Sequence, residues 1–160
     1  RIEAAAALAK LSGEGAVMTQ LVETPGTYSA IINMLGLASP VASEAAAALI
    51  YRLSLRRPCR DEIGATSSCI EELTAVLDKG SLVAQALAGG ALLNLMDSPD
   101  NQARLIDSAN VLNVLLRLGE ESVSNIVKRC AVGVLRQVVD GVGGFKAMRI
   151  KRRVEGLQLR

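Results

Sequence analysis

An apolar helical segment recurs four times along this chain at an almost constant interval. Aligning the segments on their last apolar residue gives Leu11, Leu53, Leu95 and Val138, which are 42, 42 and 43 residues apart. Each of these residues follows a polar one, and the residue three positions before it is apolar. Regular spacing of this size predicts stacked helical repeats, in which each unit covers the apolar face of its neighbour.

The period also predicts the boundaries of the units. Residues 1–12 form the last helix of a truncated repeat, and the whole repeats are 13–54, 55–96 and 97–139. Residues 140–160 begin a further, incomplete repeat with a basic tail. Because the chain starts inside a repeat, we expect it to be a fragment of a longer protein.

Breaks in the apolar pattern divide each repeat into a short, a medium and a long helix. In the first whole repeat we expect helices over 15–23, 27–37 and 40–54, with Pro40 in a first turn, where it loses no hydrogen bond. Gly26, Ser68 and Asn110 recur at intervals of 42 between the first two helices. Gly and Asn tolerate a left-handed backbone, which predicts a sharp reversal at this position.

Local signals refine the later helices. Ser68 followed by Glu71 has the spacing of a capping box. The last whole repeat is expected to use 119–122 as a connection and 123–139 as its third helix. In the incomplete repeat, we expect a buried stripe made by Phe145, Met148, Val154 and Leu157.

Charge limits the classes of partner. The net charge of +2 conceals an asymmetry, because residues 1–145 carry 12 basic and 15 acidic side chains, whereas 146–160 carry 6 and 1. A mildly acidic body gives no reason to expect nucleic-acid binding. The cluster 151–153 has the composition of a localisation or anion-binding patch, but we favour the solvated face of an incomplete repeat.

The residue types exclude most site chemistry within this chain. It has no histidine, so neither a Ser-His-Asp nor a Cys-His arrangement is possible, and we expect no catalysis, cofactor or metal. Gly141–Gly144 lacks the Lys and Ser/Thr of a phosphate loop. Cys59, Cys69 and Cys130 are expected to be reduced, packed thiols of an intracellular protein, cytoplasmic or alternatively nuclear. No apolar run is long enough for a membrane span.

The three-helix unit with a period of 42 resembles the armadillo repeat. The residues that carry the resemblance are the segments Ala7–Leu11 and Ala91–Leu95 and the reversal at Gly26, Ser68 and Asn110. The two-helix HEAT repeat has an overlapping period, but a separate short first helix in every unit favours armadillo. The resemblance implies an all-α, right-handed superhelical solenoid whose third helices line a concave groove that binds protein or an extended peptide.

The resemblance also assigns candidate groove residues. An Asn near the end of the third helix commonly contacts the peptide backbone in this family, and only one repeat keeps it. The aligned positions are Lys10, Arg52, Asn94 and Gln137. A floor of small residues and a charged rim come from the preceding turns, at Ala48, Gly90, Gly133, Glu44 and Arg129. Alternatively, Gly90 and Gly133 permit tight contact between neighbouring repeats.

The sequence therefore predicts a non-catalytic scaffold or adaptor that binds protein through this groove or packs within a larger assembly. One alternative is the substrate-recognition segment of a plant-type U-box ubiquitin ligase, whose armadillo arrays are similar. A nuclear-import adaptor is a weaker third reading, because those proteins use groove Trp residues and this chain has none. Its open repeat ends also predict self-association.

Overall fold

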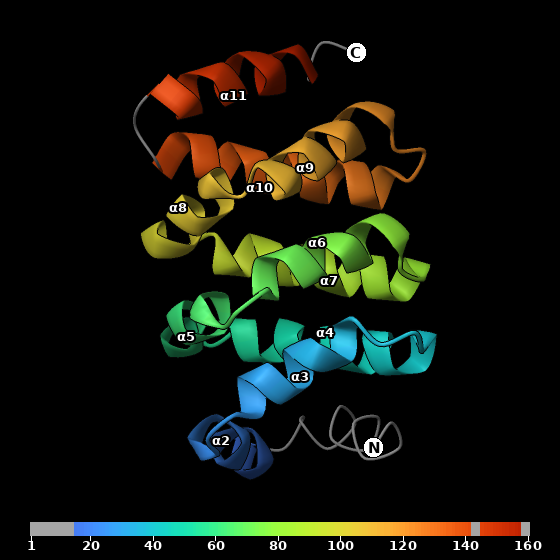
Figure 1. The fold of residues 1–160 in the computed structure, drawn as a ribbon, viewed down its shortest axis with the longest axis vertical. Coiled ribbons are helices and arrows are strands. Elements are labelled where there is room, and N and C mark those ends of the chain that lie inside the picture. Colours follow the sequence, from blue (N-terminus) through green and yellow to red (C-terminus); the bar gives the residue numbers. More distant parts are fainter. Residues whose placement is uncertain (1–14, 142–144, 158–160) are drawn as a thin grey trace.

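The computed structural model describes residues 15–141 and 145–157, and helices account for most of these residues. The expected helix over 1–12 and its Lys10 lie outside the described residues. No strand occurs within the described ranges. The elements, labelled as in Figure 1, are α2 (Gly15–Glu23), α3 (Thr27–Leu35), α4 (Pro40–Ser54), η1 (Arg57–Cys59), α5 (Arg60–Ala65), α6 (Cys69–Lys79), α7 (Leu82–Leu95), α8 (Pro99–Asp107), α9 (Ala109–Glu121), α10 (Asn125–Gly141) and α11 (Phe145–Leu157).

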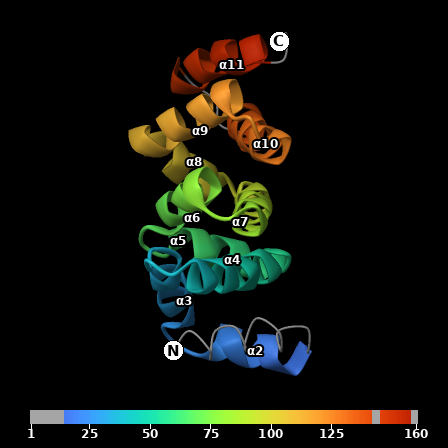
Figure 2. The same ribbon diagram turned by 90° about the vertical axis from the view of Figure 1, so that its right-hand side faces the viewer.

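The helices form a stack with α2 and α11 at opposite ends (Figure 1). The third helices of the repeats, α4, α7 and α10, lie along one side, whereas the second helices, α6 and α9, lie along the other (Figure 2). α7 contacts both α4 and α10, and α6 contacts both α3 and α9. Each repeat thus packs on its neighbours in sequence, which confirms the predicted α-solenoid.

The aligned apolar positions of the third helices lie in the core. Leu53, Leu95 and Val138 are each 0% exposed. Ala46, Ala88 and Ala131, which recur with the same spacing, are also 0% exposed. A small residue at this point lets neighbouring third helices approach closely, because helix separation depends on the side chains at the contact. One continuous cluster of buried apolar side chains connects the repeats.

A serine caps each third helix. The Oγ atoms of Ser39, Ser81 and Ser124 accept hydrogen bonds from the backbone N–H groups of Ala42, Ala84 and Val127, at 3.3, 3.2 and 3.4 Å. The three serines are 42 and 43 residues apart. Capping of an otherwise unpaired N–H therefore recurs with the repeat, and it fixes where each third helix begins.

The reversal between the first and second helices follows the sequence prediction in two repeats of three. Gly26 (φ 79°) and Ser68 (φ 62°) both adopt the left-handed conformation. The predicted capping box at Ser68 is wrong, because the Ser68 side chain makes no capping hydrogen bond and its backbone is not extended as an N-cap requires. Asn110 is also wrong as a reversal point, because α9 already begins at Ala109 after an extended Ser108.

The boundaries of the last two helices differ from those expected. α9 continues through 119–121, which the sequence assigned to a connection, because Leu118 and Gly119 are buried against the stack. α10 consequently runs from Asn125 to Gly141 rather than over 123–139.

The packed stripe of α11 is also different from that predicted. Val154 is buried as predicted (3% exposed), but Met148 is 57% exposed and Ile150, which was not predicted, is buried (7%). The side chains of Phe145 and Leu157 lie outside the described residues. The apolar positions of α11 therefore do not follow the register of the earlier first helices.

Candidate functional site

One residue per turn of each third helix faces outward along the same side of the stack. We name these residues the third-helix stripe, and all of them are exposed or half-buried. They recur with the same spacing on neighbouring helices. The stripe comprises Val41, Glu44, Ala48 and Arg52 on α4, Val83, Ala86, Gly90 and Asn94 on α7, and Ile126, Arg129, Gly133 and Gln137 on α10.

The structure thus brings the described candidate groove residues to one face. Their spacing of three or four residues keeps them on one side of each helix. Contact of α7 with both α4 and α10 joins the three sets across adjacent helices. Lys10, the remaining candidate, lies outside the described residues. The stripe is a continuous surface with small side chains or none at Ala48, Ala86, Gly90 and Gly133.

The two glycines of the stripe have a packing role between repeats. A Cβ atom on Gly90 would lie 2.8 Å from Cε2 of Tyr51, and one on Gly133 would lie 2.9 Å from Cδ2 of Leu93. Tyr51 and Leu93 are themselves 42 residues apart. In each case a large side chain of one repeat packs over a glycine of the next. These glycines therefore permit close contact between neighbouring repeats, which was the alternative to a role in the groove floor.

Polar residues near the end of the stripe are partly engaged within the protein. Asn94 donates a hydrogen bond from Nδ2 to Oγ of Ser54 in the preceding repeat, at 3.0 Å. Ser54 in turn donates to the carbonyl oxygen of Tyr51 at 2.6 Å. The Oε1 atom of Gln137 is buried and accepts no hydrogen bond from the described residues. An amide carries two N–H donors and one carbonyl oxygen, so both side chains retain capacity for a partner.

Two charged residues of the stripe, Glu44 and Arg129, lie one turn after its first positions, and a third, Arg52, lies near the end of α4. Glu44 accepts a hydrogen bond at Oε2 from Oγ of Ser81, at 2.8 Å, and this contact joins α4 to the start of α7. Arg129, the corresponding residue of α10, is exposed. The stripe therefore carries both signs of charge, and its acidic residue, Glu44, is hydrogen-bonded to the next repeat.

Hydrogen bonds between the repeats escaped the sequence prediction. The Arg60 Nε donates to the carbonyl oxygen of Ser54 at 2.7 Å, and Gln102 Nε2 donates to that of Met96, also at 2.7 Å. Arg60 and Gln102 are 42 residues apart, as are the two acceptors. In both repeats, a long polar side chain thus reaches the end of the preceding third helix. The 42-residue spacing of Arg60 and Gln102 was the one feature of the sequence that could have predicted these hydrogen bonds.

Asn101 adds a second link at the same junction. It is 0% exposed and donates from Nδ2 to the carbonyl oxygens of Arg60 and Leu95, at 2.9 and 3.0 Å. Its Oδ1 accepts a hydrogen bond from Arg104 at 3.0 Å. Arg60 also forms an ion pair with Asp97. These contacts fix the first helices α5 and α8 relative to the third-helix ends that carry the stripe.

The three thiols are free, and two of them are buried. Burial raises the pKa of Cys69 from 9.0 to about 12, with the charge of Glu71 as a smaller cause, and burial also raises the pKa of the half-buried Cys130. A nucleophilic cysteine requires the opposite shift, toward a stable thiolate. The environment of these two thiols is therefore that of packed side chains.

The raised pKa of Cys69 predicts a loss of stability in alkali. The unfolded chain releases this proton near pH 9 and the native protein only near pH 12, so stability falls as pH rises between these values. At pH 10 the loss from this group is about 1.4 kcal/mol. Urea unfolding of the wild type and of Cys69→Ala at pH 7 and pH 10 measures it. The difference between the two proteins should shrink or reverse at pH 10, and an unchanged difference would contradict the prediction.

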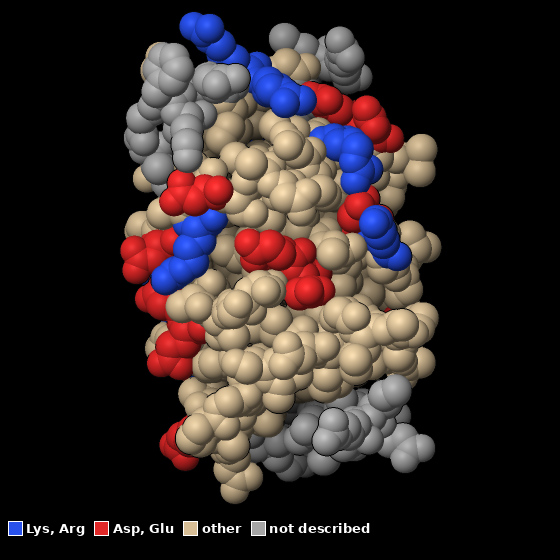
Figure 3. Space-filling model, in the orientation of Figure 1, with Lys and Arg blue, Asp and Glu red and all other residues tan. Residues whose placement is uncertain are grey.

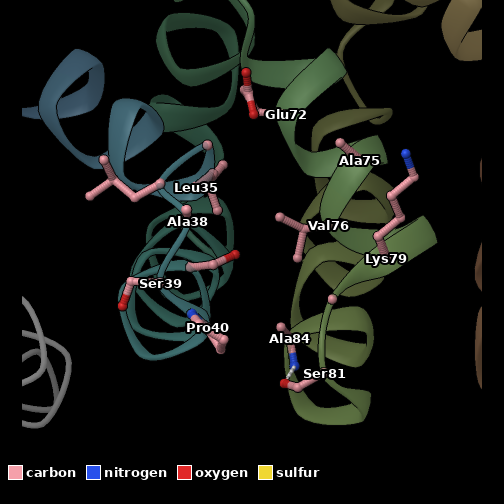
Figure 4. A pocket seen from close by; sticks show the side chains of 14 residues that line it. Leu35, Ala38, Ser39, Pro40, Glu72, Ala75, Val76, Lys79, Ser81 and Ala84 are labelled. Carbon is pink, nitrogen blue, oxygen red and sulfur yellow. Dashed lines mark hydrogen bonds between the residues drawn. The ribbon is translucent and has the colours of Figure 1, made fainter.

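A cavity of about 470 Å³ lies between the α3–α4 and α6–α7 connections, beside the first turns of α4 and α7 (Figure 4). Ser39 and Pro40 lie on one side of it, and Val76 and Ala84 on the other (Figure 4). Glu72 and Lys79 are its ionisable side chains. One carboxylate and one ammonium group at a largely apolar opening do not provide a nucleophile with its base, so this cavity has the character of a gap between layers.

Surface charge on the side of the second helices is divided. Acidic side chains gather along the edge formed by α5 and α8 and over α6, whereas most basic side chains lie toward α9 and α11, where acidic ones lie among them (Figure 3). Within the described ranges no group of His, Cys, Asp and Glu residues could hold a metal ion. A search of the same residues finds no helix with the length and apolar character needed to cross a membrane.

Comparisons with known proteins identify structural neighbours. No protein-family model and no curated protein matches this chain. One solved structure, "Designed armadillo repeat protein YIII(Dq)4CqI", superposes with a TM-score of 0.74 at 20% sequence identity, over 98% of this chain and 63% of the other, so this chain spans less than two thirds of that neighbour. A second, "Designed armadillo repeat protein YIII(Dq.V1)4CPAF in complex with peptide (KR)4", has a TM-score of 0.67 at 16% identity, over 98% and 80% of the two chains.

Proposed function

We propose, on the premise that this chain folds as an α-solenoid of armadillo-type repeats, that it is a protein-interaction scaffold. The third-helix stripe would bind an extended segment of a partner protein. The fold of the chain is that of the two designed neighbours, one of which is described in complex with a peptide. The proposed role is binding without catalysis, since the chain has no histidine and Cys59 and Cys69 are buried.

The observation that carries this proposal is the continuity of the stripe across three adjacent helices. Its central positions include Ala48 and Ala86, whose side chains project little beyond the helix backbone, whereas Gly90 and Gly133 are covered by Tyr51 and Leu93 of the preceding repeats. Small residues let a partner backbone approach closely. A peptide lying across α4, α7 and α10 would therefore meet a similar surface at each step.

Polar side chains at the far end of the stripe supply donors for such a peptide. An extended chain leaves its backbone N–H and C=O groups unpaired, and these require partners when they are removed from water. Asn94 retains one N–H donor and its carbonyl oxygen, because its single described hydrogen bond uses the other N–H. Gln137 occupies the corresponding position in the next repeat; its Oε1 is buried, so its amide N–H groups are the donors that it can offer.

A blocking substitution tests the proposal. Ala86 is exposed at the centre of the stripe, so Ala86→Trp should fill the space above α7 without disturbing the core. A peptide selected against the wild type from a displayed random library should bind Ala86→Trp at least about tenfold more weakly, a difference of about 1.4 kcal/mol.

Ala103→Trp is the matched control, because Ala103 is exposed on α8 outside the stripe. It should bind the selected peptide as the wild type does. Failure to select any peptide, or equal binding to both Trp variants, would remove the stripe from the function of this protein. Circular dichroism of each variant verifies that the helical fold is retained.

A further inference from the structure

A row of exposed aliphatic side chains crosses the first turns of the third helices. Val41, Val83 and Ile126 are 61%, 55% and 54% exposed and occupy corresponding positions, 42 and 43 residues apart. Leu82, the first residue of α7, and Val123, which precedes α10, are neighbours of these residues in the sequence and are 73% and 102% exposed. Single exposed aliphatic residues are common, whereas recurrence of Val41, Val83 and Ile126 at corresponding positions of adjacent helices indicates an interaction surface. We name these five residues the apolar row.

The apolar row forms one edge of the third-helix stripe. Val41, Val83 and Ile126 each precede the next stripe position by three residues, which places them one turn away on the same side of the helix. The third helices follow one another along a single side of the stack (Figure 2). A chain that crosses the stripe therefore passes the apolar row at each repeat.

Charge is unequal along this side. α10 carries the exposed Arg129 and Arg136 and the half-buried Lys128, against one exposed carboxylate, Asp140. Arg136 occupies the position that Tyr51 and Leu93 hold in the earlier repeats. The basic charge therefore lies toward the α10 end of the stripe.

The earlier repeats contribute no matching excess of either sign. On α4, Glu44 is opposed by Arg52, and Glu44 already accepts a hydrogen bond from Ser81. Asp97, which follows α7, is paired with Arg60. The side of the stack that holds the stripe is thus apolar along one edge, near neutral over α4 and α7, and cationic at α10.

We propose that the occupant of the stripe is an extended peptide segment that combines bulky apolar side chains with acidic ones. Its apolar side chains would cover the apolar row, and its carboxylates would meet Arg129 and Arg136 in charge-assisted hydrogen bonds. This inference rests on the proposed function and adds the chemistry of the partner. A Lys/Arg peptide of the kind bound by the designed neighbour would set cations against the cations of α10.

Four fluorescein-labelled peptides test the inference by anisotropy titration. One ten-residue probe alternates Leu with Asp, a second alternates Leu with Lys, a third alternates Ser with Asp, and the fourth is (KR)4. The Leu-Asp probe should bind at least about tenfold more tightly than each of the others. Its affinity should also fall as the salt concentration rises from roughly 50 mM to 500 mM, because screening weakens its contact with α10.

Variants locate the binding on the protein. Ile126→Ser removes a member of the apolar row and Arg129→Glu reverses the adjacent charge, and each should weaken Leu-Asp binding about tenfold or more. Their controls are Leu37→Ser, which removes an exposed aliphatic residue outside the third helices, and Arg57→Glu, which reverses an exposed charge in η1. Both controls should bind the probe as the wild type does.

The outcomes separate the two proposals. Tighter binding of the Leu-Lys or (KR)4 probe, blocked by Ala86→Trp, would overturn the inferred partner chemistry and leave the proposed function intact. Absence of binding by any peptide, selected or designed, would overturn both. Sedimentation of the chain as a dimer that Ile126→Ser dissociates would show that a second copy covers the apolar row, and it would also contradict the inference.

Discussion

Replacing Leu95 with alanine is expected to lower the free energy of unfolding by about 3 kcal/mol. Leu95 is 0% exposed at the end of α7, and it is one of the aligned apolar residues that define the period. α7 packs against α4 and α10, so neighbouring layers cannot easily collapse into the space that the truncation leaves. The cost therefore combines lost burial with a cavity.

Urea unfolding followed by circular dichroism measures this effect. Leu82→Ala is the matched control, because Leu82 belongs to the same helix but is 73% exposed. It should change stability by less than about 0.5 kcal/mol. A loss below about 1 kcal/mol for Leu95→Ala would mean that this position is not a central element of the repeat core.

Replacing Asn101 with leucine is expected to destabilise the protein by about 3 kcal/mol, at about 1 kcal/mol for each hydrogen bond lost. The side chain makes three, two as donor to the carbonyl oxygens of Arg60 and Leu95 and one as acceptor from Arg104. Leucine has a similar shape and no polar atoms, so the effect reports mainly on the hydrogen bonds. The substitution should therefore loosen the junction between the second and third whole repeats.

The control is Asn110→Leu, since Asn110 is exposed on α9. Its effect should stay within about 0.5 kcal/mol. Hydrogen exchange adds a local measurement, because the amides of α5 and α8 should lose protection in Asn101→Leu more than those of α6. Equal stability of the two Asn variants would show that the buried amide does not hold the repeats together.

The candidate face could be predicted from the sequence, because residues one repeat length apart occupy equivalent positions on successive repeats of a solenoid. Arg52, Asn94 and Gln137 were selected by their position before an aligned apolar residue, and the structure places them on one side of the stack. The apolar row was open to the same reasoning, since Val41, Val83 and Ile126 share the spacing. It was missed because periodicity alone does not separate an exposed aliphatic residue from a buried one.

Local chemistry predicted the turns only in part. Gly26 takes the left-handed conformation that was expected of it, and Ser68 takes it also. Asn110 does not, because two additional residues join the start of α9 and the reversal takes place at Ser108. In α11, Ile150 rather than Met148 is buried, since the helix has its own register against α9 and α10.

The sequence by itself determined the helical class, the period and the inward face of the third helices α4, α7 and α10, because these depend on the spacing of apolar residues along one chain. Only the tertiary structure decided which polar groups meet between repeats. Arg60, Asn101 and Gln102 each donate to a backbone carbonyl oxygen at the junction between repeats, and every residue has such an oxygen. Nothing in the side-chain pattern distinguishes one carbonyl from another, so the choice follows from how the layers stack.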